Sequence, residues 1–241
     1  MWRSLLGVAA AVALLAGCSL EVPGQASPVA SGPPQAPQNA VLRPSFSTTT
    51  EGQIDGGTAF LARWSDGRIL LLTAQHLFGE ALGLSRDHTG AELPDLVTGM
   101  TATSVDDESV EVSSGTLITI PDAVPLTTDI TRDVAGFVVD GTAAAAVLDL
   151  APAPPAPGAR VWLLAEVSGS ADRLFPATVQ DVAPEEYLQY VFDTPLDLTA
   201  TSGAPVLDAA GQVVGINVGG DDGTGVANSI ATVRPLLEDA L

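Results

Sequence analysis

The sequence predicts an all-β fold, a barrel or a sandwich, that ends in a short helix. Three observations predict it. Short runs rich in Val, Ile and Thr recur along the chain, turn signals separate them, and no long helical pattern lies between them. These features favour an all-β architecture over one in which helices alternate with strands.

The first expected strands form a hairpin. Gly57–Trp64 is strand-like, Ser65-Asp66-Gly67 is a turn signal, and Arg68–Thr73 is apolar enough to be buried on both faces. Further strands are expected at Ser109–Ile120, Val134–Val139, Val161–Val167, Thr178–Val182, Tyr187–Phe192, Ala204–Leu207, Gln212–Val218 and Gly225–Ala231.

The chain closes with the predicted helix. Thr232–Leu241 has a helical pattern, with Thr232 as its N-cap and Pro235 in or near the first turn, where a missing N–H costs little. Earlier in the chain, the Pro-rich run Ala151–Gly158 is typical of a connector between two halves of a domain.

The N-terminus has the order of a bacterial export signal. Met1–Arg3 is positive, and Ser4–Gly17 is apolar but too short to span a bilayer comfortably. Leu15-Ala16-Gly17-Cys18 resembles the lipobox of bacterial lipoproteins, which implies a signal peptide over residues 1–17 and a lipid on Cys18. A simple cleaved signal, or an anchoring helix with a chance Cys, is the alternative.

A tether should follow the lipidated cysteine. Residues 18–47 are rich in Pro, Ser and Ala and lack apolar periodicity, so they cannot bury enough apolar surface to fold. We therefore expect a flexible tether over residues 18–47 and a folded domain over residues 48–241.

Composition excludes several classes of function. With 29 acidic residues against nine basic ones the net charge is −20, which repels nucleic acid. One Cys cannot form an internal disulfide or a Cys-based zinc site, and two His leave little for a metal. We expect no metal and no cofactor. Asp221-Asp222-Gly223 could suggest calcium but is more typical of a solvated turn.

Three segments each place one polar residue beside an apolar strand. They are Leu72–Phe78 with His76, Asp133–Val139 with Asp133, and Thr201–Asp208 with Ser202. A buried Asp or His is costly unless it is paired. A Ser hydroxyl becomes a strong nucleophile when a His can take its proton and an acid orients that His.

These blocks resemble, in this order, the His, Asp and Ser blocks of chymotrypsin-fold serine proteases. The most similar type is the high-temperature-requirement group of bacterial periplasmic proteases, and the resemblance covers roughly Gly56 to Leu241. It implies two six-stranded antiparallel barrels, roughly residues 48–150 and 159–231, and a helix at 232–241.

The resemblance also implies a site. His76 would be the general base, Asp133 its orienting partner and Ser202 the nucleophile, with the N–H groups of Ala200 and Ser202 as the oxyanion hole. Leu196 would lie at the base of the specificity pocket, which implies a preference for apolar side chains. The substrate backbone would pair along three further residues, Val218, Gly219 and Gly220.

Two departures from the family pattern stand out. Ala200 occupies a position that is usually Gly, where the backbone often needs a conformation that Gly reaches cheaply. Thr201 replaces the acid that pairs with a new N-terminus in zymogen-type proteases, which implies no activation by cleavage. Alternatives to the site residues are His88, in a polar loop, and two other acids, Asp129 and Asp140.

The resulting hypothesis is a lipid-anchored, extracytoplasmic serine endopeptidase that acts on protein or peptide substrates. Ser19 after Cys18 is not the Asp that often retains lipoproteins at the inner membrane, so in a two-membrane cell we expect the periplasmic face of the outer membrane. The alternatives are an inactive protease homologue that serves as a surface-anchored protein-binding module, motivated by Ala200, and a β-sandwich lipoprotein without an active site.

Overall fold

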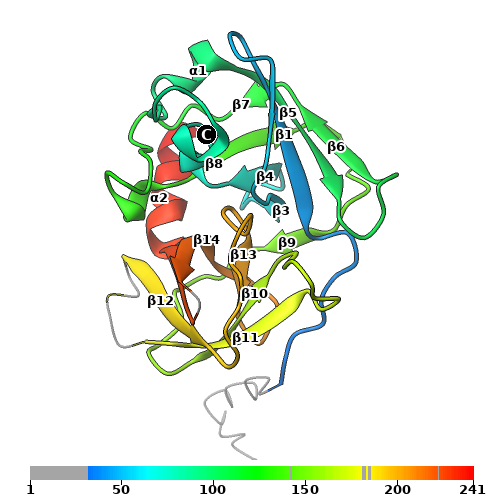
Figure 1. Cartoon of the computed structure of the whole chain (residues 1–241), viewed down its shortest axis with the longest axis vertical. Coiled ribbons are helices and arrows are strands. Elements are labelled where there is room, and N and C mark those ends of the chain that lie inside the picture. Colours follow the sequence, from blue (N-terminus) through cyan, green and yellow to red (C-terminus); the bar gives the residue numbers. More distant parts are fainter. Residues whose placement is uncertain (1–31, 142, 181–182, 184–185, 222) are drawn as a thin grey trace, which may run out of the picture.

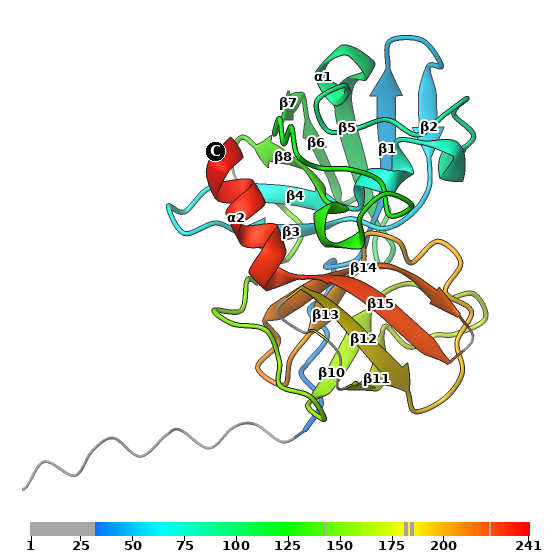
Figure 2. The same ribbon diagram turned by 90° about the vertical axis from the view of Figure 1, so that its left-hand side faces the viewer.

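The strands form two halves, stacked one on the other, with the C-terminal helix along one side (Figures 1 and 2). The computed structural model describes residues 32–141, 143–180, 183, 186–221 and 223–241. The predicted signal peptide, Cys18 and the first part of the predicted tether lie outside the described residues. Within the described residues, no helix is both long and apolar enough to cross a membrane.

The N-terminal half consists of two sheets, with strand orders β2-β1-β5-β6 and β7-β8-β4-β3-β9. All neighbouring strands are antiparallel except β3 and β9. The strands are β1 Leu42–Thr48, β2 Gln53–Asp55, β3 Phe60–Arg63, β4 Ile69–Thr73, β5 Val97–Ser104, β6 Glu111–Ser114, β7 Thr116–Leu117, β8 Ala135–Val139 and β9 Val147–Asp149.

The N-terminal half is therefore not the closed six-stranded barrel that we expected. The outer edge of β3 pairs with the parallel strand β9. The contact between β1 and the β3 side is a single bridge between Leu42 and Ala59 instead of a continuous ladder. The two sheets still share one apolar core, which includes Phe46, Leu71 and Phe137.

The C-terminal half is a closed six-stranded antiparallel barrel, as predicted, with the strand order β10-β11-β12-β15-β14-β13. Its interior is filled by apolar side chains such as Leu163, Tyr190 and Val206. The strands are β10 Arg160–Leu164, β11 Leu174–Val179, β12 Tyr187–Phe192, β13 Pro205–Leu207, β14 Val213–Asp221 and β15 Thr224–Ser229.

The helices are short apart from the last one, α2, which spans Ile230–Ala240. It begins two residues before the predicted start, because Ser229 is the N-cap and accepts the Ala231 N–H at 3.3 Å. Pro235 consequently lies inside the helix. The others are η1 Gln75–Leu77, η2 Glu80–Leu82, α1 Leu93–Leu96 and η3 Ile130–Arg132.

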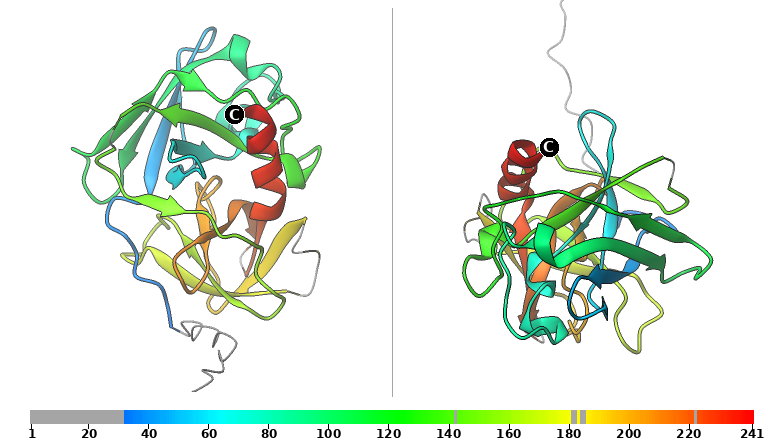
Figure 3. Two further views of the ribbon diagram at one scale, coloured as in Figure 1. Left: turned by 180° about the vertical axis from the view of Figure 1, so that it is seen from behind. Right: turned by 90° about the horizontal axis from the view of Figure 1, so that it is seen from above.

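The folded domain begins before the predicted boundary at residue 48. Strand β1 starts at Leu42, and Phe46 is fully buried with its ring centroid 4.5 Å from that of Phe78. The segment before β1 runs alongside the C-terminal half (Figure 3), where Pro33 and Pro34 help to line a cavity against Ala209–Gln212. The prediction failed here because the Ser and Pro residues of β1 continue the composition of the tether.

Ion pairs connect the two halves. Arg43 of β1 lies 2.6 Å from Glu166, which follows β10, and Arg173 lies 3.3 Å from Asp106. The hydrogen bond from the Arg43 guanidinium holds the pKa of Glu166 below its ordinary value. These partly exposed pairs add modestly to stability. The larger contribution comes from the apolar seam, where Ile230 and Leu237 of α2 share a core with Phe60 and Leu72.

Candidate active site

The pairing of β4 with β8 brings His76 and Asp133 to the same edge of a sheet. In this antiparallel register Thr73, the last residue of β4, lies opposite Ala135, the first residue of β8. His76 follows β4 by three residues and Asp133 precedes β8 by two. Because antiparallel neighbours place the end of one strand beside the start of the other, the two side chains converge.

The contact between His76 and Asp133 has two hydrogen bonds. The His76 backbone N–H donates to Asp133 Oδ1 at 2.8 Å, and His76 Nδ1 lies 2.6 Å from Asp133 Oδ2. The Asp133 side chain is fully buried, whereas 12% of the His76 side chain is exposed. A carboxylate can only accept, so it selects the tautomer with the proton on Nδ1 and leaves Nε2 free to take a proton.

The competing residues lie elsewhere. Asp129 accepts from the backbone N–H and the hydroxyl of Thr131 and from Arg132, and the Thr131 hydrogen bond lowers the pKa of Asp129. Asp140 is exposed. His88 is half-buried in a loop, where its N–H donates to the Phe78 carbonyl at 3.1 Å.

The loop that carries Ser202 lies against the N-terminal half. The Ser202 carbonyl accepts the Thr58 N–H at 2.7 Å. A Cβ at Gly203 would lie 2.1 Å from the Thr58 carbonyl oxygen and 3.1 Å from the N atom of Ala74, so only Gly permits this approach. Ser202 is therefore close to the C-terminal end of β4, and His76 lies three residues beyond that end. The hydrogen bonds within the described residues include none between the side chains of Ser202 and His76.

A buried polar network supports the same loop from the C-terminal barrel. Asn217 Nδ2 donates to the Thr201 carbonyl at 3.1 Å and contacts Thr201 Oγ1 at 3.0 Å. The Asn217 Oδ1 atom accepts the Tyr190 hydroxyl at 2.6 Å, and the Gly203 N–H donates to the Asn217 carbonyl. The side chains of Thr201, Asn217 and Tyr190 are fully buried. A polar group without a hydrogen-bond partner would be strongly destabilising there. Asn217 and Tyr190 have no signal of this role in the sequence, because both residues lie within apolar strand patterns.

Ala200 occupies the third position of a tight turn. The Thr201 N–H donates to the Leu198 carbonyl at 3.1 Å, and Ala200 has φ = 65° while Thr199 is not in the positive range. This combination is that of a type II turn, whose third residue is normally Gly. Within the described residues neither the Ala200 N–H nor the Ser202 N–H donates a hydrogen bond. Both N–H groups are thus without an acceptor in this part of the chain.

A cavity of about 310 Å³ lies beside this turn, between the 196–199 loop and Gly219–Asp221. Leu196 lines it and also packs against the barrel core. Val218 is buried and does not line the cavity. The ladder between β13 and β14 ends at the Pro205–Ile216 pair, and Asn217 still bonds Gly203 and Ala204 through its carbonyl and N–H. Beyond Asn217, this edge of β14 has no partner strand within the described residues. The Asp221 carboxylate accepts the N–H groups of Gly223 and Thr224.

Comparisons with known proteins agree with this architecture. A family model described as a trypsin-like peptidase domain matches residues 57–216. The active form of the M. tuberculosis protease Rv3671c matches 92% of this chain and 94% of its own at 18% identity, with a TM-score of 0.56. The serine endoprotease of Yersinia pestis matches 85% of this chain and 64% of its own at 15% identity, with a TM-score of 0.55. No curated protein matches the sequence.

The structure therefore has the chymotrypsin-like serine protease fold, which is the class that the sequence predicted. The chain belongs to the trypsin-like peptidase family, because the family model covers more than half of it.

The positive φ of Ala200 predicts that Ala200→Gly stabilises the protein. An L-residue other than Gly in the left-handed region costs about 1–2 kcal/mol, and Gly removes this cost while adding entropy to the unfolded chain. We expect a net gain of up to about 1 kcal/mol in the free energy of unfolding, measured in urea. The control is Ala210→Gly, in an exposed turn without positive φ, which should be destabilising. Equal losses in both variants would contradict the strain at Ala200.

Proposed function

We propose that the protein is a serine endopeptidase in which Ser202, His76 and Asp133 form a catalytic triad. The observation that carries the proposal is the double contact of Asp133 with His76, which fixes the imidazole with Nε2 free. His76 then takes the proton of Ser202 as Oγ attacks the carbonyl carbon of a peptide bond. His76 returns that proton to the leaving amine, and water hydrolyses the resulting ester of Ser202 by the same route.

The oxyanion hole in this proposal is formed by the backbone N–H groups of Ala200 and Ser202. Both are free of acceptors within the described residues, and the left-handed Ala200 gives the turn a conformation that Gly usually adopts. Donors fixed in advance stabilise the developing negative charge, and the loss of one donor costs about 3–4 kcal/mol of the barrier. Ala200 therefore supports the hole at a cost in strain.

Labelling with a fluorophosphonate probe tests the triad. We expect the folded protein to label, Ser202→Ala to abolish labelling, and His76→Ala and Asp133→Asn to slow it by roughly three orders of magnitude or more, because the nucleophile loses its base or the base loses its orientation. The readout is the labelling rate followed by gel fluorescence. The matched control is Ser170→Ala in a surface loop, which should label like the wild type. A folded wild type that does not label contradicts the proposal.

An inactive homologue that serves as a surface-anchored protein-binding module is the second candidate, and it is motivated by Ala200. That candidate is favoured when the Ala200 N–H points away from the site, or when His76 lies beyond hydrogen-bond reach of both Ser202 and Asp133. His76 contacts Asp133 at 2.6 Å, and the Ala200 N–H donates to no acceptor within the described residues. The contact of His76 with Asp133 supports the enzyme over the binding module.

The support for a preference for apolar side chains on the acyl side of the cleaved bond is the Leu196 side chain, which lines the cavity. Two carboxylates, of Asp197 and Asp221, also line the cavity, but Asp197 accepts the Thr199 N–H at 2.9 Å and Asp221 accepts two further N–H groups. A hydrogen bond from Thr199 lowers the pKa of Asp197.

We expect peptides with Val, Leu or Phe at the acyl-side position to be cleaved faster than those with Lys or Arg. Burial of such side chains gains about 1.5–3 kcal/mol, or roughly tenfold to a hundredfold in rate. The measurement is kcat/KM over a panel of peptides that differ at this position. Leu196→Asp should reduce the discrimination. A wild-type preference for Arg would overturn the assignment and point to the two carboxylates.

We further propose that the enzyme is anchored by a lipid on Cys18 and acts outside the cytoplasm, at the periplasmic face of the outer membrane in a two-membrane cell. The support is the order of the export signal and the lipobox-like tetrapeptide. The net charge of −20 keeps the folded part off an anionic membrane surface and favours neutral or cationic protein substrates.

Membrane fractionation tests the anchor. In a bacterial host we expect the wild type to incorporate a fatty-acid analogue and to sediment with membranes, whereas Cys18→Ser should lose the label and become soluble or remain unprocessed, because it has no thiol to acylate. Ser19→Ala is the control and should behave like the wild type. Incorporation of the label into Cys18→Ser would contradict the assignment.

A further inference from the structure

We infer that Thr58 is a positioning residue of the active site, and this inference rests on the proposed function. Thr58 lies in the segment before β3 in the N-terminal half, whereas the Ser202 loop belongs to the C-terminal half. Thr58 is 3% exposed and has no part in the proton transfers described above. Its role is to hold the loop that carries the nucleophile at a fixed place relative to the histidine.

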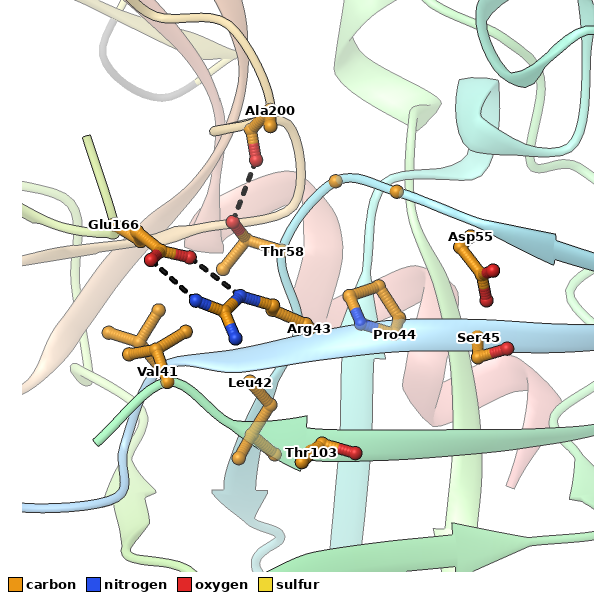
Figure 4. A pocket seen from close by; sticks show the side chains of 13 residues that line it. Val41, Leu42, Arg43, Pro44, Ser45, Asp55, Thr58, Thr103, Glu166 and Ala200 are labelled. Atoms are coloured by element: carbon orange, nitrogen blue, oxygen red, sulfur yellow. Dashed lines mark hydrogen bonds and ion pairs between the residues drawn. The ribbon is translucent and has the colours of Figure 1, made fainter. Parts of the chain in front are cut away.

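Thr58 makes two hydrogen bonds to the Ser202 loop. Its N–H donates to the Ser202 carbonyl at 2.7 Å, and its hydroxyl donates to the Ala200 carbonyl at 2.9 Å. Figure 4 shows the second bond, with the Thr58 hydroxyl aimed at the Ala200 oxygen. Within the described residues neither carbonyl has another donor. The two bonds therefore fix both ends of the segment that would supply the oxyanion hole.

Thr58 is tied in turn to the strand that leads to His76. The Thr73 hydroxyl donates to the Thr58 carbonyl at 2.7 Å, and Thr73 is the last residue of β4. Gly203 of the Ser202 loop also packs closely against the backbone of Thr58 and Ala74. A short path of hydrogen bonds thus runs from Ser202 through Thr58 to Thr73, three residues before His76.

The Thr58 hydroxyl is important for the position of Ala200, because few other contacts hold Ala200 in place. Ala200 is exposed, and one side of its turn borders a cavity of about 430 Å³, which Thr58, Arg43 and Glu166 also line (Figure 4). Apolar packing does not restrain the turn on that side. The conformation of Ala200 is also one that Ala adopts at a cost. The Thr58 hydroxyl is thus the side-chain contact that holds the Ala200 carbonyl in place.

Valine at position 58 provides the test, because it matches the shape of Thr and retains the backbone bonds but lacks the hydroxyl. We expect Thr58→Val to lower the limiting rate of fluorophosphonate labelling by about 10- to 100-fold, since a misplacement of about 1 Å at a reacting group costs on the order of 100-fold. The probe concentration for half-maximal rate should stay unchanged. Thr58→Ser, which restores the hydroxyl, should recover most of the rate.

The melting temperature separates positioning from folding. Ser104→Ala removes a buried hydroxyl that bonds Asn39 in the N-terminal half, far along the chain from the loop, and should lower the melting temperature without slowing labelling. If Thr58→Val does not fold, the comparison of Thr58→Ser with Thr58→Ala isolates the same hydroxyl. If Thr58→Val labels at the wild-type rate, the positioning role of Thr58 is wrong, whereas the proposed function is unaffected. Absence of labelling in the wild type overturns the proposed function, and with it this inference.

Discussion

The buried carboxylate of Asp133 imposes the constraint on which the site depends. It is the one charged side chain that is fully buried within the described residues, and both of its hydrogen bonds come from His76. A buried charge without donors would be strongly destabilising, so the chain must bring the turn after β4 to the start of β8. Consecutive residues of both strands are buried, so their register is set by how the apolar side chains on the two faces of the sheet pack against their neighbours.

Much of the fold and the identity of the candidate site residues could be predicted from the sequence. The hairpin at Ser65-Asp66-Gly67 forms as expected, because turn residues and a fully apolar return strand leave few alternatives. The polar residues beside apolar strands identified His76, Asp133 and Ser202, since a polar residue at such a place is costly without a partner. The structure brings the first two into contact and places the third against the neighbouring segment.

The features that could not be predicted depend on contacts between distant segments. Most of strand β1 falls within the predicted tether, because Pro44 and its neighbouring serines have the composition of a linker, and only pairing with β5 makes the segment a strand. The parallel contact of β9 with β3, which opens the N-terminal barrel, has no local signal. Thr58 and Asn217 likewise acquire their importance from bonds to residues far along the chain.

The loop that carries Ser202 is held by neutral groups. Thr201 stands where zymogen-type relatives have an acid, and its hydroxyl contacts Asn217 and the Leu198 carbonyl. Burial raises the pKa of Tyr190, so its hydroxyl remains a donor to Asn217 throughout the physiological range. These bonds hold the loop without an ion pair within the described residues. The loop depends on correct packing of the barrel, and its order should therefore be acquired when the domain folds.

If the proposed lipid on Cys18 is present, the early start of the folded domain limits the distance between the membrane and the proposed active site. With a lipid on Cys18 and the chain lying along the C-terminal half from residue 32 onward, only residues 19–31 separate the anchor from the fold. Thirteen residues span at most about 45 Å when fully extended. The active site would then reach only substrates within a limited distance of the bilayer. Under this proposal, location would contribute to substrate selection, because proteins held close to the same membrane would encounter the active site far more often than proteins elsewhere in the compartment.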